Sequence, residues 1–242
     1  MIGAVITASG PADRCVGVAL PRTLGRMAVA EGSRLAGLAR DGVFTWDDLH
    51  AMPEDGFRWE LVDGQLLVTA SPAGRHQYAV AQLHLLLHAG CPDDVLVMVA
   101  PYDWVVSRAT VFVPDLMVVR RDEFDPDGPF TGTPLLVIEV RSPSTAATDQ
   151  TLKRQKYEQH GASAYWLVDP GGPTGGGPDG VGSTSGAAAP RVPSLTALRL
   201  RGGAYVEEAS VAGDEPYEAN FPFPVTVVPG HLVAPRAGTA TS

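Results

Sequence analysis

The sequence predicts a mixed α/β fold in which helices flank a central sheet. Short apolar runs typical of buried strands recur through the middle of the 242-residue chain. A helix-like segment, from about 148 to 160, lies between two such runs at 135–140 and 164–168. A strand–helix–strand series of this kind forms a right-handed crossover between strands of one sheet. The apolar fraction of 45% is that of an ordinary globular core.

Composition limits the class of protein. The net charge of -9 argues against a protein that coats nucleic acid nonspecifically, but it leaves open an enzyme that meets DNA at one local patch. Residues 141–160 are locally basic, although a solvated helix face explains such charges equally well. No run approaches the ~18 apolar residues of a transmembrane helix, and the N-terminus is a poor signal peptide. With only two cysteines, we expect a protein of the reducing cytoplasm.

Domain organisation follows from the distribution of Gly and Pro. Residues 1–42 show no sustained period and predict a loosely ordered N-terminal extension, with Met27 as an alternative start. We expect one ordered domain over 43–235. Within it, the Gly- and Pro-rich segment 170–190 cannot build a core, which predicts a flexible insertion that forms a long hairpin loop.

The N-terminal half of the domain predicts two helices and a hairpin. Thr45 is suited to cap a short helix that begins beside it. Asp63-Gly64 lies between two apolar runs and predicts a tight hairpin turn. A second helix is predicted from about 76 to 89, because several of its apolar residues and one histidine share a face: His76, Val80, Leu83 and Leu87.

The remaining predicted elements are mostly strands. The run at 135–140 is nearly continuously apolar, which is typical of a strand that is covered on both faces. Further strands are expected at 95–99, 102–106, 110–113, 116–119, 164–168, 195–201, 204–208 and 225–228.

Polar residues at the ends of apolar runs form the candidate site. Asp115 opens one run, Glu139 lies inside the run at 135–140, and Lys153 lies on the following helix. Carboxylates in such surroundings cost desolvation energy unless something pairs with them, and two that share one Mg²⁺ are a solution. Strand alternation places Arg141 on the same face as Glu139, where a cation can hold the scissile phosphate or orient the attacking water. The pattern predicts metal-dependent cleavage of phosphodiesters.

Every candidate residue except Glu139, which the apolar run surrounds, has a simpler interpretation beside the functional one. Asp115 follows a proline and is compatible with an ordinary Pro-Asp turn. Arg141 is a candidate salt-bridge partner of the neighbouring acid, and Lys153 alone would be a surface lysine. Glu60 either joins a metal site or lies on the exposed face of the hairpin. His76 is either a second acid–base group or a local binder near the helix N-terminus.

Together these residues resemble the Uma-two family of restriction endonucleases, within the PD-(D/E)XK nuclease superfamily. The resemblance runs from about Phe57 to Pro170, with a weaker tail to Val228. It is carried by WELVDGQL, SPAGRHQYAV, VPDLMVV, PLLVIEVRSPST, GASAYWLVDP and the helix that contains Asp149, Lys153 and Tyr157.

The resemblance implies a restriction-endonuclease-like core with a nuclease site that depends on Mg²⁺ or Mn²⁺. Asp115 and Glu139 match the two acids of the family motif. With the carbonyl of Val140 they would hold the metal ion, which lowers the pKa of a bound water. Lys153 matches the motif lysine, moved from the strand to the helix, and would orient the nucleophile or stabilise the developing charge.

One position departs from the superfamily pattern. Arg141 stands where lysine is usual, and a guanidinium cannot act as a base because it is nearly always protonated. Glu60 and His76 match family positions at the edge of the site.

These observations predict a cytoplasmic, metal-dependent DNA endonuclease. The alternative is a catalytically inactive module of the same fold that binds nucleic acid or protein, which the charge of -9 and Arg141 favour. A third candidate is a hydrolase of another phosphate-containing substrate. Nucleases of this kind often cut both strands as dimers, so a homodimer is an expectation.

Overall fold

The computed structural model describes residues 4–6, 43–52, 58–69, 72–142, 147–172 and 190–233, with backbone alone for 4–6 and 147–150. The chain divides into two compact units. The larger unit contains Pro72–Asp103 and Pro114–Ser242, and the smaller contains Ile2–Ser71 and Trp104–Val113. Most of the expected N-terminal extension lies outside the described residues. The exception is a strand, β1 (Ala4–Ile6), which the sequence did not predict.

The smaller unit is built on a sheet whose five described strands run in the order β1-β3-β2-β6-β5. A short helix, α2 (Trp46–His50), precedes β2 in the chain. The core of this unit is apolar and consists of Phe44, Leu49, Leu61, Leu66 and Val111. The strands are β2 (Arg58–Val62), β3 (Gln65–Thr69), β5 (Trp104–Ser107) and β6 (Thr110–Phe112).

Local sequence signals account for the start of α2 and for the β2–β3 hairpin. The Thr45 side chain accepts a hydrogen bond from the Asp48 backbone N–H, and the Asp48 carboxylate accepts one from the Thr45 N–H, which forms a capping box. Asp63 (φ 50°) and Gly64 (φ 78°) adopt the positive φ values that a tight hairpin turn requires. The predicted cap and the predicted turn are both confirmed.

The larger unit contains a mixed sheet whose six described strands run in the order β11-β10-β9-β8-β7-β4. Among these described strands, only β8 and β9 pair in parallel, and helix α4 lies between them in the chain. This is the strand–helix–strand crossover that the sequence predicts, and the mixed α/β class is confirmed. The strands are β4 (Val95–Val99), β7 (Leu116–Arg120), β8 (Leu136–Val140), β9 (Ala164–Asp169), β10 (Ser194–Arg201) and β11 (Ala204–Ala212).

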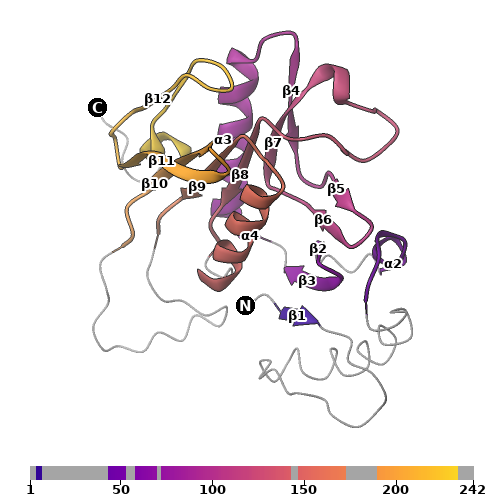
Figure 1. The fold of residues 1–242 in the computed structure, drawn as a ribbon. Coiled ribbons are helices and arrows are strands. Elements are labelled where there is room, and N and C mark those ends of the chain that lie inside the picture. The colour runs from indigo at the N-terminus through magenta and orange to yellow at the C-terminus, as the bar shows by residue number, and fades with distance from the viewer. Residues whose placement is uncertain are drawn as a thin grey trace, which may run out of the picture. The chain divides into compact units, whose positions relative to one another are not determined.

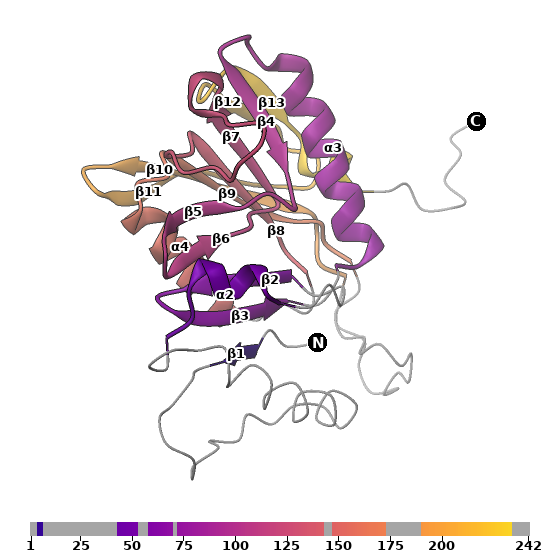
Figure 2. The ribbon, with the colours of Figure 1, turned by 90° about the vertical axis from the view of Figure 1, so that its right-hand side faces the viewer.

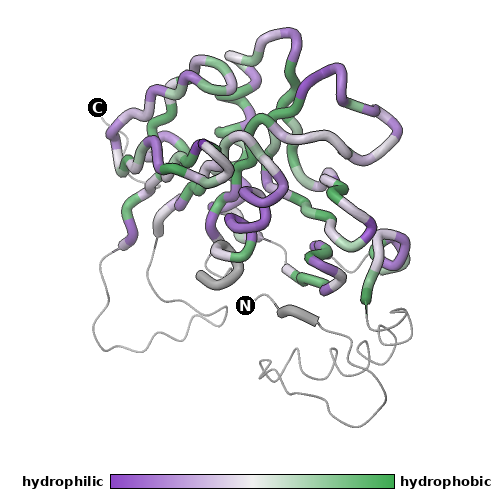
Figure 3. Tube along the Cα trace, in the orientation of Figure 1, coloured by the Kyte–Doolittle hydropathy of each residue, from purple (hydrophilic) through white to green (hydrophobic). Residues whose placement is uncertain are grey.

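Two helices cover opposite faces of this sheet (Figures 1 and 2). They are α3 (Gly74–Gly90) and α4 (Ala147–Gln159). Figure 3 shows hydrophilic residues on α4 and the outer loops, and hydrophobic residues along the central strands. The remaining elements are two short strands, β12 (Tyr217–Ala219) and β13 (Val225–Val227), and two 3-10 turns, η1 (Arg121–Glu123) and η2 (Pro229–Leu232). The sequence did not predict β12.

The Gly- and Pro-rich segment joins two neighbouring strands. β9 and β10 pair antiparallel, with Asp169 opposite Ser194, and Gly172 bridges Arg191 just beyond them. Residues 173–189 of the expected insertion lie outside the described residues. The sheet therefore continues across this connection, because the strands before and after it are adjacent.

Helix α3 packs on the core through the face that the sequence predicts. Its buried residues are His76, Ala79, Val80, Leu83 and Leu87. The four apolar residues among them join the strand residues of the main hydrophobic cluster. Among the helices that the structure describes, none has the length and apolar character needed to cross a bilayer.

Two leucines of α3 provide a matched test of this packing. Leu83 is fully buried, whereas Leu85 is 61% exposed. We expect Leu83→Ala to lower the free energy of unfolding by about 2–5 kcal/mol, because it leaves a cavity in the core. Leu85→Ala should stay within about 0.5 kcal/mol of wild type. Urea unfolding of both variants measures the difference, and equal losses would contradict the assigned helix face.

Candidate functional site

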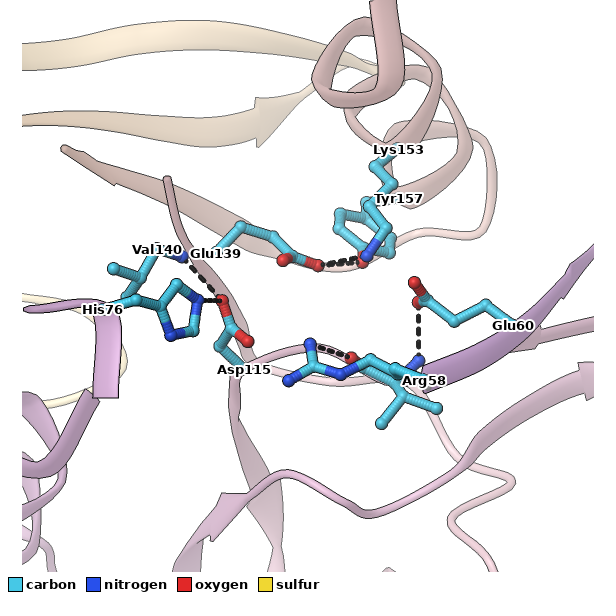
Figure 4. Close-up of polar contacts among 9 residues, drawn as sticks. Arg58, Glu60, His76, Asp115, Glu139, Val140, Lys153 and Tyr157 are labelled. Carbon is cyan, nitrogen blue, oxygen red and sulfur yellow. Dashed lines mark hydrogen bonds and ion pairs between the residues drawn. The ribbon is translucent and has the colours of Figure 1, made fainter. Parts of the chain in front are cut away.

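Asp115 lies immediately before β7 and is almost wholly buried (1% exposed). Its Oδ2 accepts a hydrogen bond from the backbone N–H of Val140 at 2.9 Å and contacts Nε2 of His76 at 2.9 Å (Figure 4). The β7–β8 register pairs Leu116 with Ile138. Asp115 and Glu139 are therefore the next residues along the two strands at this end of the sheet.

Glu139 is bound by two side chains of α4. Its Oε1 accepts a hydrogen bond from Lys153 Nζ at 3.1 Å and another from the Tyr157 hydroxyl at 2.6 Å (Figure 4). The exposed fractions are 8% for Glu139, 7% for Lys153 and 0% for Tyr157. Lys153 and Tyr157 are four residues apart and so share one helix face. The structure thus brings together the predicted acid on β8 and the predicted lysine on α4.

His76 occupies the first turn of α3, and its buried ring contacts Asp115. Its other ring nitrogen, Nδ1, is buried and has no hydrogen-bond partner among the described residues. The sequence offered two interpretations of His76, a second acid–base group or a local binder near the helix N-terminus. The structure places its ring in contact with Asp115, 39 residues away in the chain.

Arg141 contacts a different acid from the one suggested by the sequence. Its Nη1 lies 3.4 Å from Oδ2 of Asp169, the last residue of β9. Arg191 Nη1 reaches the same oxygen at 2.9 Å. The ion pair of Glu139 is with Lys153. Arg141 therefore belongs to a basic group around Asp169.

Glu60 lies in the smaller unit, whereas the residues described above lie in the larger one. It is fully buried on β2, which excludes the interpretation that it lies on an exposed face. Its Oε1 accepts a hydrogen bond from the Val113 N–H at 2.8 Å, and Arg58 donates to the Val113 carbonyl at 3.3 Å (Figure 4). Both side chains thus hold the backbone of Val113, two residues before Asp115 in the chain.

A buried tyrosine lies next to the Glu139 cluster. The ring centroids of Tyr165 and Tyr157 are 5.5 Å apart. Burial raises the pKa of the Tyr165 hydroxyl above its usual range; the Glu139 charge adds to this shift and Lys153 opposes it. Within the described part of the chain, this hydroxyl has no hydrogen-bond partner. Tyr165 is therefore neutral throughout the physiological pH range.

The donor set is compatible with a hard divalent cation. Asp115, Glu139 and the carbonyl of Val140 are oxygen donors, which Mg²⁺ prefers. The described residues contain no group of three or more His, Cys, Asp or Glu side chains that could hold a metal ion. Mg²⁺ does not require one, because it commonly binds through one or two carboxylates, keeps several waters and contacts substrate phosphates.

Comparison with known proteins assigns the family. A family model, Uma2, described as "Putative restriction endonuclease", matches residues 46–226. The chain belongs to the Uma2 family. The resemblance read from the sequence motifs is confirmed, and the match covers most of the larger unit and the later part of the smaller one.

A solved structure confirms the fold. It is a "putative nuclease belonging to DUF820" from Anabaena variabilis ATCC 29413, with a TM-score of 0.52 and 18% sequence identity. The similarity covers 74% of this chain and 89% of that protein. At this level of identity the likeness shows the fold alone. A search of curated proteins finds no match.

Some residues of the site were not assigned a role by the sequence. Tyr157 was noted only as part of the family pattern, although its spacing of four from Lys153 was a usable signal. Asp169 likewise appeared only within a family motif. Arg58 carried no local signal, because its contact with Val113 spans 55 residues of sequence.

Tyr157 and Tyr165 form a matched pair for testing the polar contact to Glu139. Tyr157→Phe removes a hydroxyl that donates to a carboxylate, and we expect it to lower the free energy of unfolding by about 1.5–3 kcal/mol. Tyr165→Phe removes a buried hydroxyl without a partner in the described structure, so it should be neutral or slightly stabilising. Urea unfolding at neutral pH compares them, and equal losses would contradict the assigned contact.

Tyr165 also predicts a dependence of stability on alkaline pH. Its pKa is raised in the folded state, so its contribution to stability is complete below the unfolded-state pKa of about 10 and declines as pH rises above it. We therefore expect the free energy of unfolding of Tyr165→Phe to fall less steeply than that of wild type above pH about 10. Parallel pH curves for the two proteins would overturn this assignment.

Proposed function

We propose that this protein is a cytoplasmic, metal-dependent endonuclease that hydrolyses phosphodiester bonds in DNA. The observation that carries the proposal is the arrangement at the end of β8. There Asp115 is bound to the backbone of Val140, and the preceding residue, Glu139, is bound to Lys153. Two acids and a lysine held at one strand end are suited to hydrolysis of a phosphate ester. Membership in the Uma2 family, whose description is that of an endonuclease, supports the same reaction class.

Asp115, Glu139 and the Val140 carbonyl would hold Mg²⁺ or Mn²⁺. When bound, such an ion lowers the pKa of a coordinated water and neutralises charge on the phosphate. The buried environment supports this use of the carboxylates, because charges removed from bulk water interact strongly with a divalent ion.

The other residues position these groups and stabilise charge. Lys153 is a cationic donor beside Glu139, suited to orient the attacking water or to stabilise negative charge that develops on the phosphate oxygens. His76 orients Asp115, and Tyr157 orients Glu139. In the reaction, the water gives up one proton as its oxygen bonds to phosphorus, the bond from phosphorus to the leaving sugar oxygen breaks, and that oxygen takes up one proton.

Arg141 and Glu60 have supporting roles in this proposal. Arg141 cannot serve as a base because guanidinium stays protonated, so it contributes charge and position. Glu60 holds the backbone of Val113, ahead of Asp115 in the chain. A homodimer would supply two such sites for cutting both strands.

Plasmid cleavage tests the proposal. Purified protein should nick or linearise supercoiled plasmid in Mg²⁺ or Mn²⁺, and EDTA should abolish the activity. We expect Asp115→Asn, Glu139→Gln and Lys153→Gln each to reduce the rate at least about 100-fold, because each removes a charge that acts on the transition state. Glu207→Gln, which neutralises an exposed carboxylate on β11, should cleave at the wild-type rate.

The outcomes separate the candidate functions. Cleavage that survives Glu139→Gln would reveal a contaminant and contradict the assignment. DNA binding without cleavage under any metal condition would instead support the inactive binding module, which the charge of -9 and Arg141 favour. Turnover of a small phosphodiester without action on nucleic acid would indicate a hydrolase of another substrate.

A further inference from the structure

Two arginines converge on one buried carboxylate at the carboxyl end of the parallel strand pair. Val140 on β8 pairs with Val168 on β9, so Arg141 and Asp169 are the next residues in register. Asp169 Oδ2 accepts from Arg141 at 3.4 Å and from Arg191 at 2.9 Å. Its Oδ1 accepts from the backbone N–H of Gly171 at 2.8 Å. Asp169 is therefore fixed on both oxygens and holds the two guanidinium groups in place.

A third arginine lies against the same segment. Arg75 Nη1 donates to the carbonyl of Pro170 at 3.5 Å. A Cβ atom on Gly172 would lie 3.1 Å from Arg75 Nε, so the guanidinium lies close against the glycine backbone. Gly172 also bridges Arg191, with N–H to carbonyl distances of 3.0 and 2.8 Å. Residues 169–172 thus connect all three arginines.

The charges in this cluster do not cancel. Two guanidinium groups contact the Asp169 carboxylate and that of Arg75 lies against Pro170, so these four described side chains carry a formal excess of two positive charges in a chain whose net charge is -9. The side chains of Arg141 and Arg191 are 37% and 31% exposed, whereas that of Asp169 is 7% exposed. A guanidinium carries five N–H donors, and among the described residues Arg141 and Arg191 each use one on Asp169. Both retain donors for a further anion.

The cluster is joined directly to the candidate catalytic residues. Arg75 precedes His76 on α3, and Arg141 follows Val140 at the end of β8. From Glu139 to Arg141 the chain advances by roughly 6–7 Å at strand spacing. An anion held by the arginines would therefore lie about that far from a phosphate bound at Glu139. In a nucleic-acid strand, that neighbouring anion is the next backbone phosphate.

We propose that Arg75, Arg141 and Arg191, preorganised by Asp169, bind the DNA backbone phosphate adjacent to the one that is cut. This rests on the proposed endonuclease function and assigns the arginines to substrate positioning rather than to chemistry. Guanidinium suits this use, because its planar donors match phosphate oxygens. Contacts to phosphate fix the register of the duplex and carry no sequence information.

The test measures DNA binding separately from cleavage. Fluorescence anisotropy measures the affinity for a short labelled DNA duplex. Ca²⁺ replaces Mg²⁺ in the buffer, and the measurement is repeated at a series of salt concentrations. The double variant Arg141→Gln/Arg191→Gln should bind about tenfold more weakly. Its slope of log affinity against log salt should become shallower by about 1, as expected for loss of one phosphate contact. Two unrelated duplex sequences should lose affinity by the same factor.

The matched control is Arg120→Gln. Arg120 lies at the opposite end of β7 from Asp115, and its exposed side chain pairs with Glu123. It should keep wild-type affinity and slope. Arg75→Gln should lower the DNA affinity and make the salt slope shallower, as the double variant does. Because Arg75 contacts the Pro170 carbonyl rather than Asp169, this result distinguishes the cluster from a simple structural ion pair.

The results distinguish failure of this inference from failure of the proposed function. If wild type cleaves DNA and the folded double variant keeps its affinity and salt slope, the arginine cluster is structural and the inference is overturned alone. If wild type neither binds nor cleaves DNA, the endonuclease proposal fails and this inference fails with it. Loss of affinity with a shallower slope, beside an unchanged Arg120→Gln, supports this inference, whereas the endonuclease proposal is supported only by cleavage in the plasmid assay.

Discussion

The burial of Asp115 and Glu139 at the ends of two neighbouring strands is the constraint on which the rest of the larger unit depends. A carboxylate removed from water is costly unless donors replace its hydration. Four groups supply those donors: the Val140 N–H and the side chains of His76, Lys153 and Tyr157. Removing one partner of such a pair is far more destabilising than the pair is stabilising. The two acids and their four donors therefore depend on one another for electrostatic reasons.

The topology delivers those donors to the acids. The first turn of α3 brings His76 to Asp115, whereas α4, on the opposite face of the sheet, brings Lys153 and Tyr157 to Glu139 (Figures 2 and 4). Because α4 connects two parallel strands, it must pack back across the sheet between them. The same crossover that closes the hydrophobic core thus places a cation beside the acid. All five residues of β8 are buried, so its polar contacts are confined to those the neighbouring elements supply.

Two kinds of cation are kept apart by this architecture. The lysine is buried and bound to Glu139, where its compact charge acts at short range. Arg141 and Arg191 are partly exposed and contact Asp169, one strand away. In the function proposed above, the first environment suits stabilisation of charge at the reacting phosphate, and the second suits positioning of a long polyanion. The departure from the superfamily pattern at Arg141 is consistent with that division.

The sequence by itself determined the elements whose signals are local. The capping box at Thr45, the Asp63-Gly64 turn, the buried face of α3 and the crossover around α4 follow from turn chemistry and periodicity, which act over a few residues. Only the tertiary structure decided which cation meets which acid, the contact of Arg58 with Val113 and the pairing of β1 with β3. These depend on sheet register between segments far apart in the chain. A local pattern sets the direction of a side chain, whereas its partner is set by packing of the whole unit.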